Sequence, residues 1–135
     1  MAAKRKTAPS APVVWKDEPD EHDYPAAASY LSLLAGDTTV KATVDALRKA
    51  PVVTFKAKDI LRASSLPLLP VDNAHVASDL KKIVAGQQLS PVLLVRGDAA
   101  TGRPALIADG YHRVCAGYRT DENTDVPVRI VALGG

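Results

Sequence analysis

Apolar residues occur along this chain either at helical spacing or in short continuous runs, and these two patterns predict most of its secondary structure. Helical spacing, with Gly or Pro near the ends, marks four longer stretches and one short one. Brief runs rich in Val, Ile and Leu predict strands. The expected helices cover residues 25–35, 39–50, 58–63, 73–86 and 111–118. The expected strands cover residues 52–55, 91–95, 104–108 and 126–131.

This order predicts a small mixed α/β (α+β) domain, in which helices pack on a mixed sheet. Strands 91–95 and 104–108 flank a turn rich in Gly, Asp and Thr, so they are expected to form a hairpin. The last strand contains Pro127, which favours a sheet edge or a strand start. Long alternating βαβ units are missing from the pattern, which argues against a doubly wound parallel sheet.

Composition divides the chain into three expected parts. Residues 1–22 are rich in Pro and charge and are predicted to form a flexible tail. Within the tail, Lys4, Arg5 and Lys6 form a basic cluster that could contact DNA or an acidic partner, although a solvated segment has the same pattern. Trp15 is expected to dock either on the body of the domain or on a partner. Residues 23–51 are predicted as a helical extension, and residues 52–135 as the main domain.

The composition is that of an ordinary globular protein, and it argues against a strongly basic, a disulfide-bonded or a membrane-spanning protein. The chain has 135 residues, 47% of them hydrophobic, and a net charge of +2, which is too small to indicate a nucleic-acid binder by itself. Its single cysteine cannot form an internal disulfide. Apolar runs fall short of the roughly 20 residues that span a bilayer. We therefore expect a cytoplasmic protein without membrane contact.

The candidate chemistry is concentrated at one strand-to-helix turn, Gly110-Tyr111-His112-Arg113. Glycine permits a close backbone approach, arginine offers a planar fork to phosphate oxygens, and the first helical turn presents unpaired N–H groups. Asp109 precedes the turn and could hold magnesium, orient a neighbour, cap the helix or act as a base. The alternative interpretation is an ordinary surface turn.

A second group of polar residues lies on the helix predicted over 73–86. His75, Ser78 and Lys82 are spaced by three and four residues, which places them on one face, away from the apolar stripe. Such a face can meet a nucleotide, although a solvated surface would have the same pattern. Cys115 lies within the last helix and is expected to be a small buried side chain. The scattered histidines and single cysteine do not support a structural zinc site.

Four segments together resemble the ParB/sulfiredoxin-like superfamily. Residues 69–80 are similar to the helix that opens the nucleotide site of sulfiredoxins, and residues 89–95 to a Pro-then-apolar strand of ParB N-terminal domains. Residues 109–116 resemble the Gly-Glu-Arg-Arg box of ParB and the Gly-Cys-His-Arg box of sulfiredoxin. Residues 126–131 resemble the closing Val-Pro strand.

The resemblance implies a domain that binds a nucleoside triphosphate with Mg²⁺. It assigns phosphate contacts to the tetrad, Gly110 to Arg113, and nucleotide contacts to the 73–86 helix. His75 and Lys82 stand where the family has a lysine and a threonine. Tyr111 replaces the catalytic cysteine of sulfiredoxin and the glutamate of ParB, so sulfinic-acid reduction is not expected. Residues 1–135 also contain no segment like the helix-turn-helix domain that follows in ParB.

Three functions are therefore open at this stage. The first is a nucleotide-binding module or nucleotide-dependent switch, associated with DNA through the basic cluster. The second is a small phosphotransferase or hydrolase, in which Asp109 serves magnesium or acts as a base and Arg113 stabilises phosphate charge. The third is a scaffold with a vestigial pocket. Residues 24–50 are expected either to cover the sheet or to mediate a homodimer.

Overall fold

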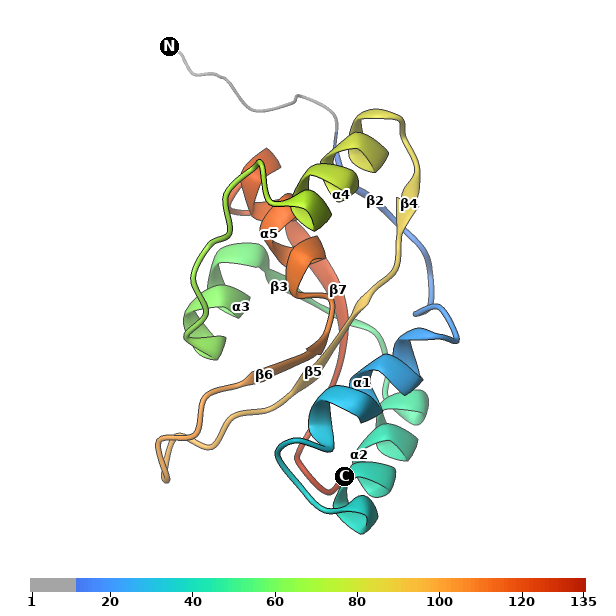
Figure 1. Ribbon diagram of the computed structural model, residues 1–135, viewed down its shortest axis with the longest axis vertical. Helices are drawn as coiled ribbons and strands as arrows, with labels where there is room; N and C mark the ends of the chain where they lie inside the picture. The colour runs from blue at the N-terminus through green and yellow to red at the C-terminus, as the bar shows by residue number, and fades with distance from the viewer. Residues whose placement is uncertain (1–11) are drawn as a thin grey trace.

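A computed structural model describes residues 12–135 of the chain (Figure 1). The described part contains five helices and six strands. The helices are α1 (Asp23–Leu31), α2 (Asp37–Lys49), α3 (Ala57–Ser64), α4 (Ala74–Val84) and α5 (Tyr111–Thr120). The strands are β2 (Val14–Trp15), β3 (Val53–Lys56), β4 (Gln88–Leu89), β5 (Val92–Val95), β6 (Leu106–Asp109) and β7 (Asp125–Val131).

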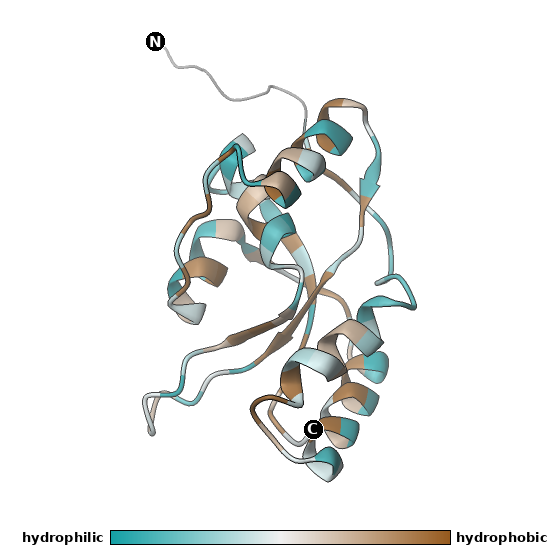
Figure 2. Cartoon of the chain, in the orientation of Figure 1, coloured by the Kyte–Doolittle hydropathy of each residue, from teal (hydrophilic) through white to brown (hydrophobic). Residues whose placement is uncertain are grey.

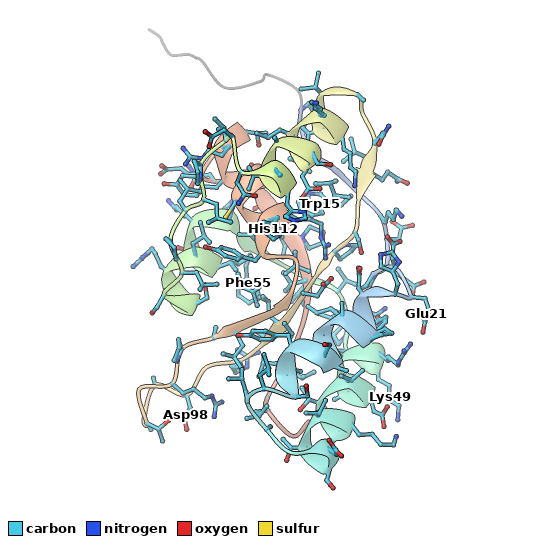
Figure 3. All side chains as sticks on the ribbon, viewed as in Figure 1. Trp15, Glu21, Lys49, Phe55, Asp98 and His112 are labelled. Atoms are coloured by element: carbon cyan, nitrogen blue, oxygen red, sulfur yellow. The ribbon has the colours of Figure 1, made fainter. Side chains whose placement is uncertain are left out.

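The main sheet is mixed and has the strand order β3-β7-β5-β6. β5 and β6 form the expected antiparallel hairpin, with Asp98 in the turn at its tip (Figure 3). β7 runs antiparallel to β3 and parallel to β5, so it lies inside the sheet rather than at an edge. Pro127 is tolerated because pairing with β5 begins only at Val128. The small mixed α/β fold is therefore confirmed.

The two faces of the sheet carry separate hydrophobic clusters, which is why the β5 run is apolar at every position. Leu93 and Val95 pack with α1 and α2 on one face. Val92 and Leu94 belong to the cluster that contains α3, α4 and α5 on the other face. Figure 2 shows these apolar strands between helices whose outer sides are mostly hydrophilic. The sheet is thus the middle layer of three.

The expected organisation needs correction at the tail. Residues 12–22, assigned to the tail by composition, lie on the body: Val14 and Trp15 pair in parallel with Gln88 and Leu89, and Trp15 packs against the core. For the helical extension the structure shows the first of the two expected roles, because α1 and α2 cover one face of the sheet through α1–β6 and α2–β7 contacts. The cluster Lys4, Arg5 and Lys6 lies outside the described residues.

Membrane insertion finds no support in the described part of the chain. None of the helices within residues 12–135 is both long and apolar enough to cross a bilayer.

Candidate functional site

Helix α4 and the beginning of helix α5 enclose a polar pocket with a volume of about 240 Å³. Six of the seven residues that the sequence nominated for phosphate or nucleotide contact line it, together with Asp109. Asp79 completes the lining. The full set is His75, Ser78, Asp79, Lys82, Asp109, Gly110, His112 and Arg113.

The backbone at Gly110 sets the geometry of the pocket. Gly110 has φ of +113°, a conformation that L side chains rarely adopt, and it joins β6 directly to α5. Because the chain turns so sharply here, the helix begins at Tyr111. No acceptor within residues 12–135 pairs with the N–H groups of Tyr111, His112 and Arg113, whereas Val114 N–H donates to the Gly110 carbonyl.

Helix α4 is held in register by its N-cap. Asn73, one of the two capping candidates in the sequence, accepts hydrogen bonds from the backbone N–H groups of His75 and Val76 at 3.0 and 3.2 Å. Val76 and Ile83 are buried in the core, and the pocket residues of α4 lie on an adjacent side of the helix. The helical spacing of the apolar stripe therefore also positions the polar residues.

Two imidazoles meet across the pocket, one from each helix. The ring centroids of His75 and His112 lie 4.6 Å apart. Figure 3 shows His112 beside α4, although it belongs to α5. Burial, together with the nearby His75 and Arg113, lowers the pKa of His112, and the opposing effect of Asp79 is smaller. His112 is consequently neutral at pH 7 before any ligand binds.

Arg113 is anchored through one end of its guanidinium. Its Nη2 donates to Asp109 Oδ2 at 2.9 Å and to the Pro91 carbonyl at 3.3 Å, and it lies 3.7 Å from Asp23 Oδ2. Nε is buried and has no partner in the described part of the chain. All of these contacts use Nη2, which leaves Nη1 available to a ligand in the pocket.

Two carboxyl groups balance the positive charge of the pocket. Asp79 lies 3.9 Å from Lys82, and Asp109 pairs with Arg113. Burial raises the pKa of Asp79, and burial, together with the neighbouring Asp23, raises the pKa of Asp109 against the opposing effect of Arg113. Apart from the histidines, the lining holds two cations, Lys82 and Arg113, and these two carboxyl groups, whose charges cancel when both are ionised. Added positive charge must come from protons or from a metal ion.

Tyr111 is the nominated residue that the structure places outside the pocket. Its hydroxyl donates to the Pro67 carbonyl at 2.6 Å, and its ring stacks on the His112 ring with the centroids 5.7 Å apart, so it contacts a pocket residue without lining the pocket. Cys115 is fully buried, as expected, and burial raises the pKa of its thiol. A thiolate nucleophile is therefore not available at this site.

The sequence interpretation missed three residues around the pocket. Asp79 has a recognisable signal, because it lies four residues after His75 on the same helical face. Asp23 and Ser90 have no such signal, since long-range packing brings Asp23 to Arg113 and Ser90 to Asp23. Asp20, His22 and Asp23 form the single group within residues 12–135 whose side chains are spaced for a metal ion, and it lies outside the pocket.

Comparison with known proteins does not extend this description. No protein-family model, curated protein or solved structure matches the chain. The function must therefore be argued from the geometry of the pocket.

Proposed function

We propose that the pocket between α4 and α5 binds the phosphate groups of a nucleotide. Arg113 carries this proposal: its guanidinium is fixed through Nη2, while Nη1 and the unpaired N–H groups of α5 remain for an anion. Lys82, Ser78 and the two histidines add further donors around the same space. The tight anchoring of Arg113 spares a ligand the entropic cost of ordering that side chain.

The size of the pocket supports phosphate rather than a whole nucleotide. Small-molecule sites typically enclose roughly 300–1,000 Å³, and this pocket holds about 240 Å³. Its lining is polar and contains no aromatic side chain other than histidine. We therefore place the phosphates inside it and the sugar and base outside.

Charge favours a nucleotide that brings magnesium. The pocket is close to neutral when its carboxyls are ionised. A triphosphate without a metal ion would therefore gain little electrostatic attraction from it. Asp109 and Asp79 offer the oxygen ligands that Mg²⁺ prefers, and Mg²⁺ usually keeps several waters and phosphate oxygens. The ion would screen phosphate charge from these carboxylates. The residues present therefore fit a nucleoside triphosphate with Mg²⁺.

We also propose that the domain is ParB/sulfiredoxin-like. In support, the tetrad stands at a strand-to-helix turn, and the polar face of α4 shares one pocket with it, as the resemblance implied. Tyr111, which replaces the family's cysteine or glutamate, does not line the pocket. The proposed role is thus a binding module or switch, with DNA contact through the Lys4–Lys6 cluster and homodimerisation as subsidiary proposals.

Replacing Lys82 with Gln should weaken nucleotide binding about tenfold, because a phosphate loses one charge-assisted contact. Isothermal titration with ATP, CTP and GTP, each with Mg²⁺, measures the effect. Lys81→Gln is the matched control, since Lys81 neighbours Lys82 on α4 but does not line the pocket. The absence of binding to all three nucleotides at millimolar concentration would refute the proposed function.

Anion binding should strengthen as the pH falls from 7.5 to 5.5. The lowered pKa of His112 keeps the imidazole neutral in the free protein, and a bound dianion favours its protonated form. Sulfate is a suitable probe because its own charge stays constant over this range. The affinity for sulfate is measured at each pH from the shifts of backbone amide resonances during titration. Its dependence on pH should be smaller in His112→Asn than in the wild type. An equal pH effect in the variant would contradict the assignment.

A phosphotransferase or hydrolase is the second candidate, favoured by the position of Asp109. This carboxyl lines the pocket, and its raised pKa brings it nearer the range of a general base. In this case Arg113 would stabilise the charge of the transferred phosphoryl group. Release of ADP or phosphate in a substrate screen distinguishes the enzyme from the binding module. Turnover that persists in Arg113→Ala would exclude this role for Arg113.

A further inference from the structure

Asp23 links helix α1 to the phosphate pocket. It is the first residue of α1, lies 90 positions before Arg113 in the sequence, and is only 3% exposed. Ser90 Oγ donates a short hydrogen bond to Asp23 Oδ2, and the same hydroxyl accepts the Asp20 backbone N–H at 2.9 Å. A buried carboxylate at the start of α1 is thus held firmly beside the pocket.

The carboxylates of Asp23 and Asp109 share the charge of one guanidinium. Asp109 has a hydrogen bond to Nη2, whereas Asp23 approaches the same atom only to 3.7 Å, beyond hydrogen-bonding distance. Asp109 and the Pro91 carbonyl are therefore sufficient to orient the Arg113 side chain. Asp23 contributes negative charge at this point without being needed for that orientation.

We propose that Asp23 limits the affinity of the pocket for anions, so that α1 acts as an electrostatic restraint on Arg113. The proposal rests on the proposed phosphate site. An arriving phosphate must draw the guanidinium charge away from a carboxylate about 4 Å away, in surroundings that screen less than water does. Any change that moves α1 from the sheet would remove this carboxylate and raise the affinity for phosphate.

Asp23→Asn tests the restraint with little change of shape. The asparagine carbonyl can still accept the hydrogen bond from Ser90, while the negative charge is removed. We expect pyrophosphate, titrated calorimetrically without Mg²⁺ at pH 7.5 and low salt, to bind about three- to tenfold more tightly than to the wild type. Structural damage to the pocket would weaken binding, so an increase in affinity separates the electrostatic role from a structural one.

Asp17→Asn is the matched control, because Asp17 is exposed and belongs to the same N-terminal segment. Its affinity for pyrophosphate should equal that of the wild type. If the wild type binds pyrophosphate and Asp23→Asn binds it equally or less tightly, the restraint is refuted and the phosphate site stands. If neither protein binds millimolar pyrophosphate either without or with Mg²⁺, the proposed function fails as well.

A measurement on the wild type covers the case in which Asp23→Asn does not fold. Saturation with pyrophosphate should shift the ¹³C resonance of the Asp23 carboxyl, since the anion competes for its guanidinium partner. The carboxyl of Asp17 serves as the internal reference and should not move. An Asp23 signal that is unchanged at saturation would overturn the proposal.

Discussion

Gly110→Ala should destabilise the protein by about 3 kcal/mol or more and abolish phosphate binding. The φ angle of +113° is strained for alanine. A Cβ would also stand 2.8 Å from Val92 Cγ2 and 2.9 Å from Arg113 Nη2, and both neighbours are closely packed. Relief of these overlaps requires Arg113 to leave its anchor. Urea unfolding measures the loss of stability, and titration with pyrophosphate measures the loss of the site.

Gly102→Ala separates backbone strain from overlap. Gly102 has φ of +77°, and no atom lies within 4 Å of the position that its Cβ would occupy. This variant should lose about 1–2 kcal/mol and keep its affinity for pyrophosphate. Equal losses of stability in the two variants would show that the contacts with Val92 and Arg113 contribute nothing at Gly110.

The elements that could be predicted from the sequence are those with a strong local signal. The α4 stripe and its Asn73 cap are local, and so are the β-rich run of β5 and the glycine before α5. The polar face of α4 follows from the same spacing. Its position next to the tetrad was inferred from a family resemblance, and the α4–α5 packing brings the two groups into one pocket.

What could not be predicted depends on contacts between distant segments. β2 and β4 pair over only two residues each, which is too short for any periodicity to appear. Residues 12–22 are rich in charge, and composition alone assigns them to a tail. Asp23 precedes the helix expected over residues 25–35, and nothing near it in the sequence indicates that Arg113 lies 3.7 Å away. The restraint on the pocket is therefore visible only in three dimensions.

Arg113→Gln should cost about 3–5 kcal/mol of stability at pH 7.5, besides removing the proposed phosphate ligand. The substitution leaves Asp23 and Asp109 close together without their shared cation, and their side chains are only 4% and 19% exposed. Uncompensated carboxylates in such surroundings are far more costly than the loss of a surface ion pair. Urea unfolding of the wild type and the variant gives the difference.

The size of this difference should depend on pH in a defined direction. Burial already raises the pKa of Asp109 in the folded wild type, so its carboxyl favours folding below its ordinary pKa and loses that contribution as the pH rises through the folded pKa. Arg113 opposes the rise, and its removal increases the pKa further. When the pH is lowered to 4.5, protonation relieves part of the repulsion between the two carboxylates. The difference in free energy of unfolding between the variant and the wild type should therefore become smaller.

Arg62→Gln provides the control, because its 3.2 Å pair with Asp59 is exposed and should contribute less than about 1 kcal/mol at either pH. If the loss of stability in Arg113→Gln stays constant from pH 7.5 to 4.5, the carboxyl groups of Asp23 and Asp109 do not depend on Arg113 for their charge balance.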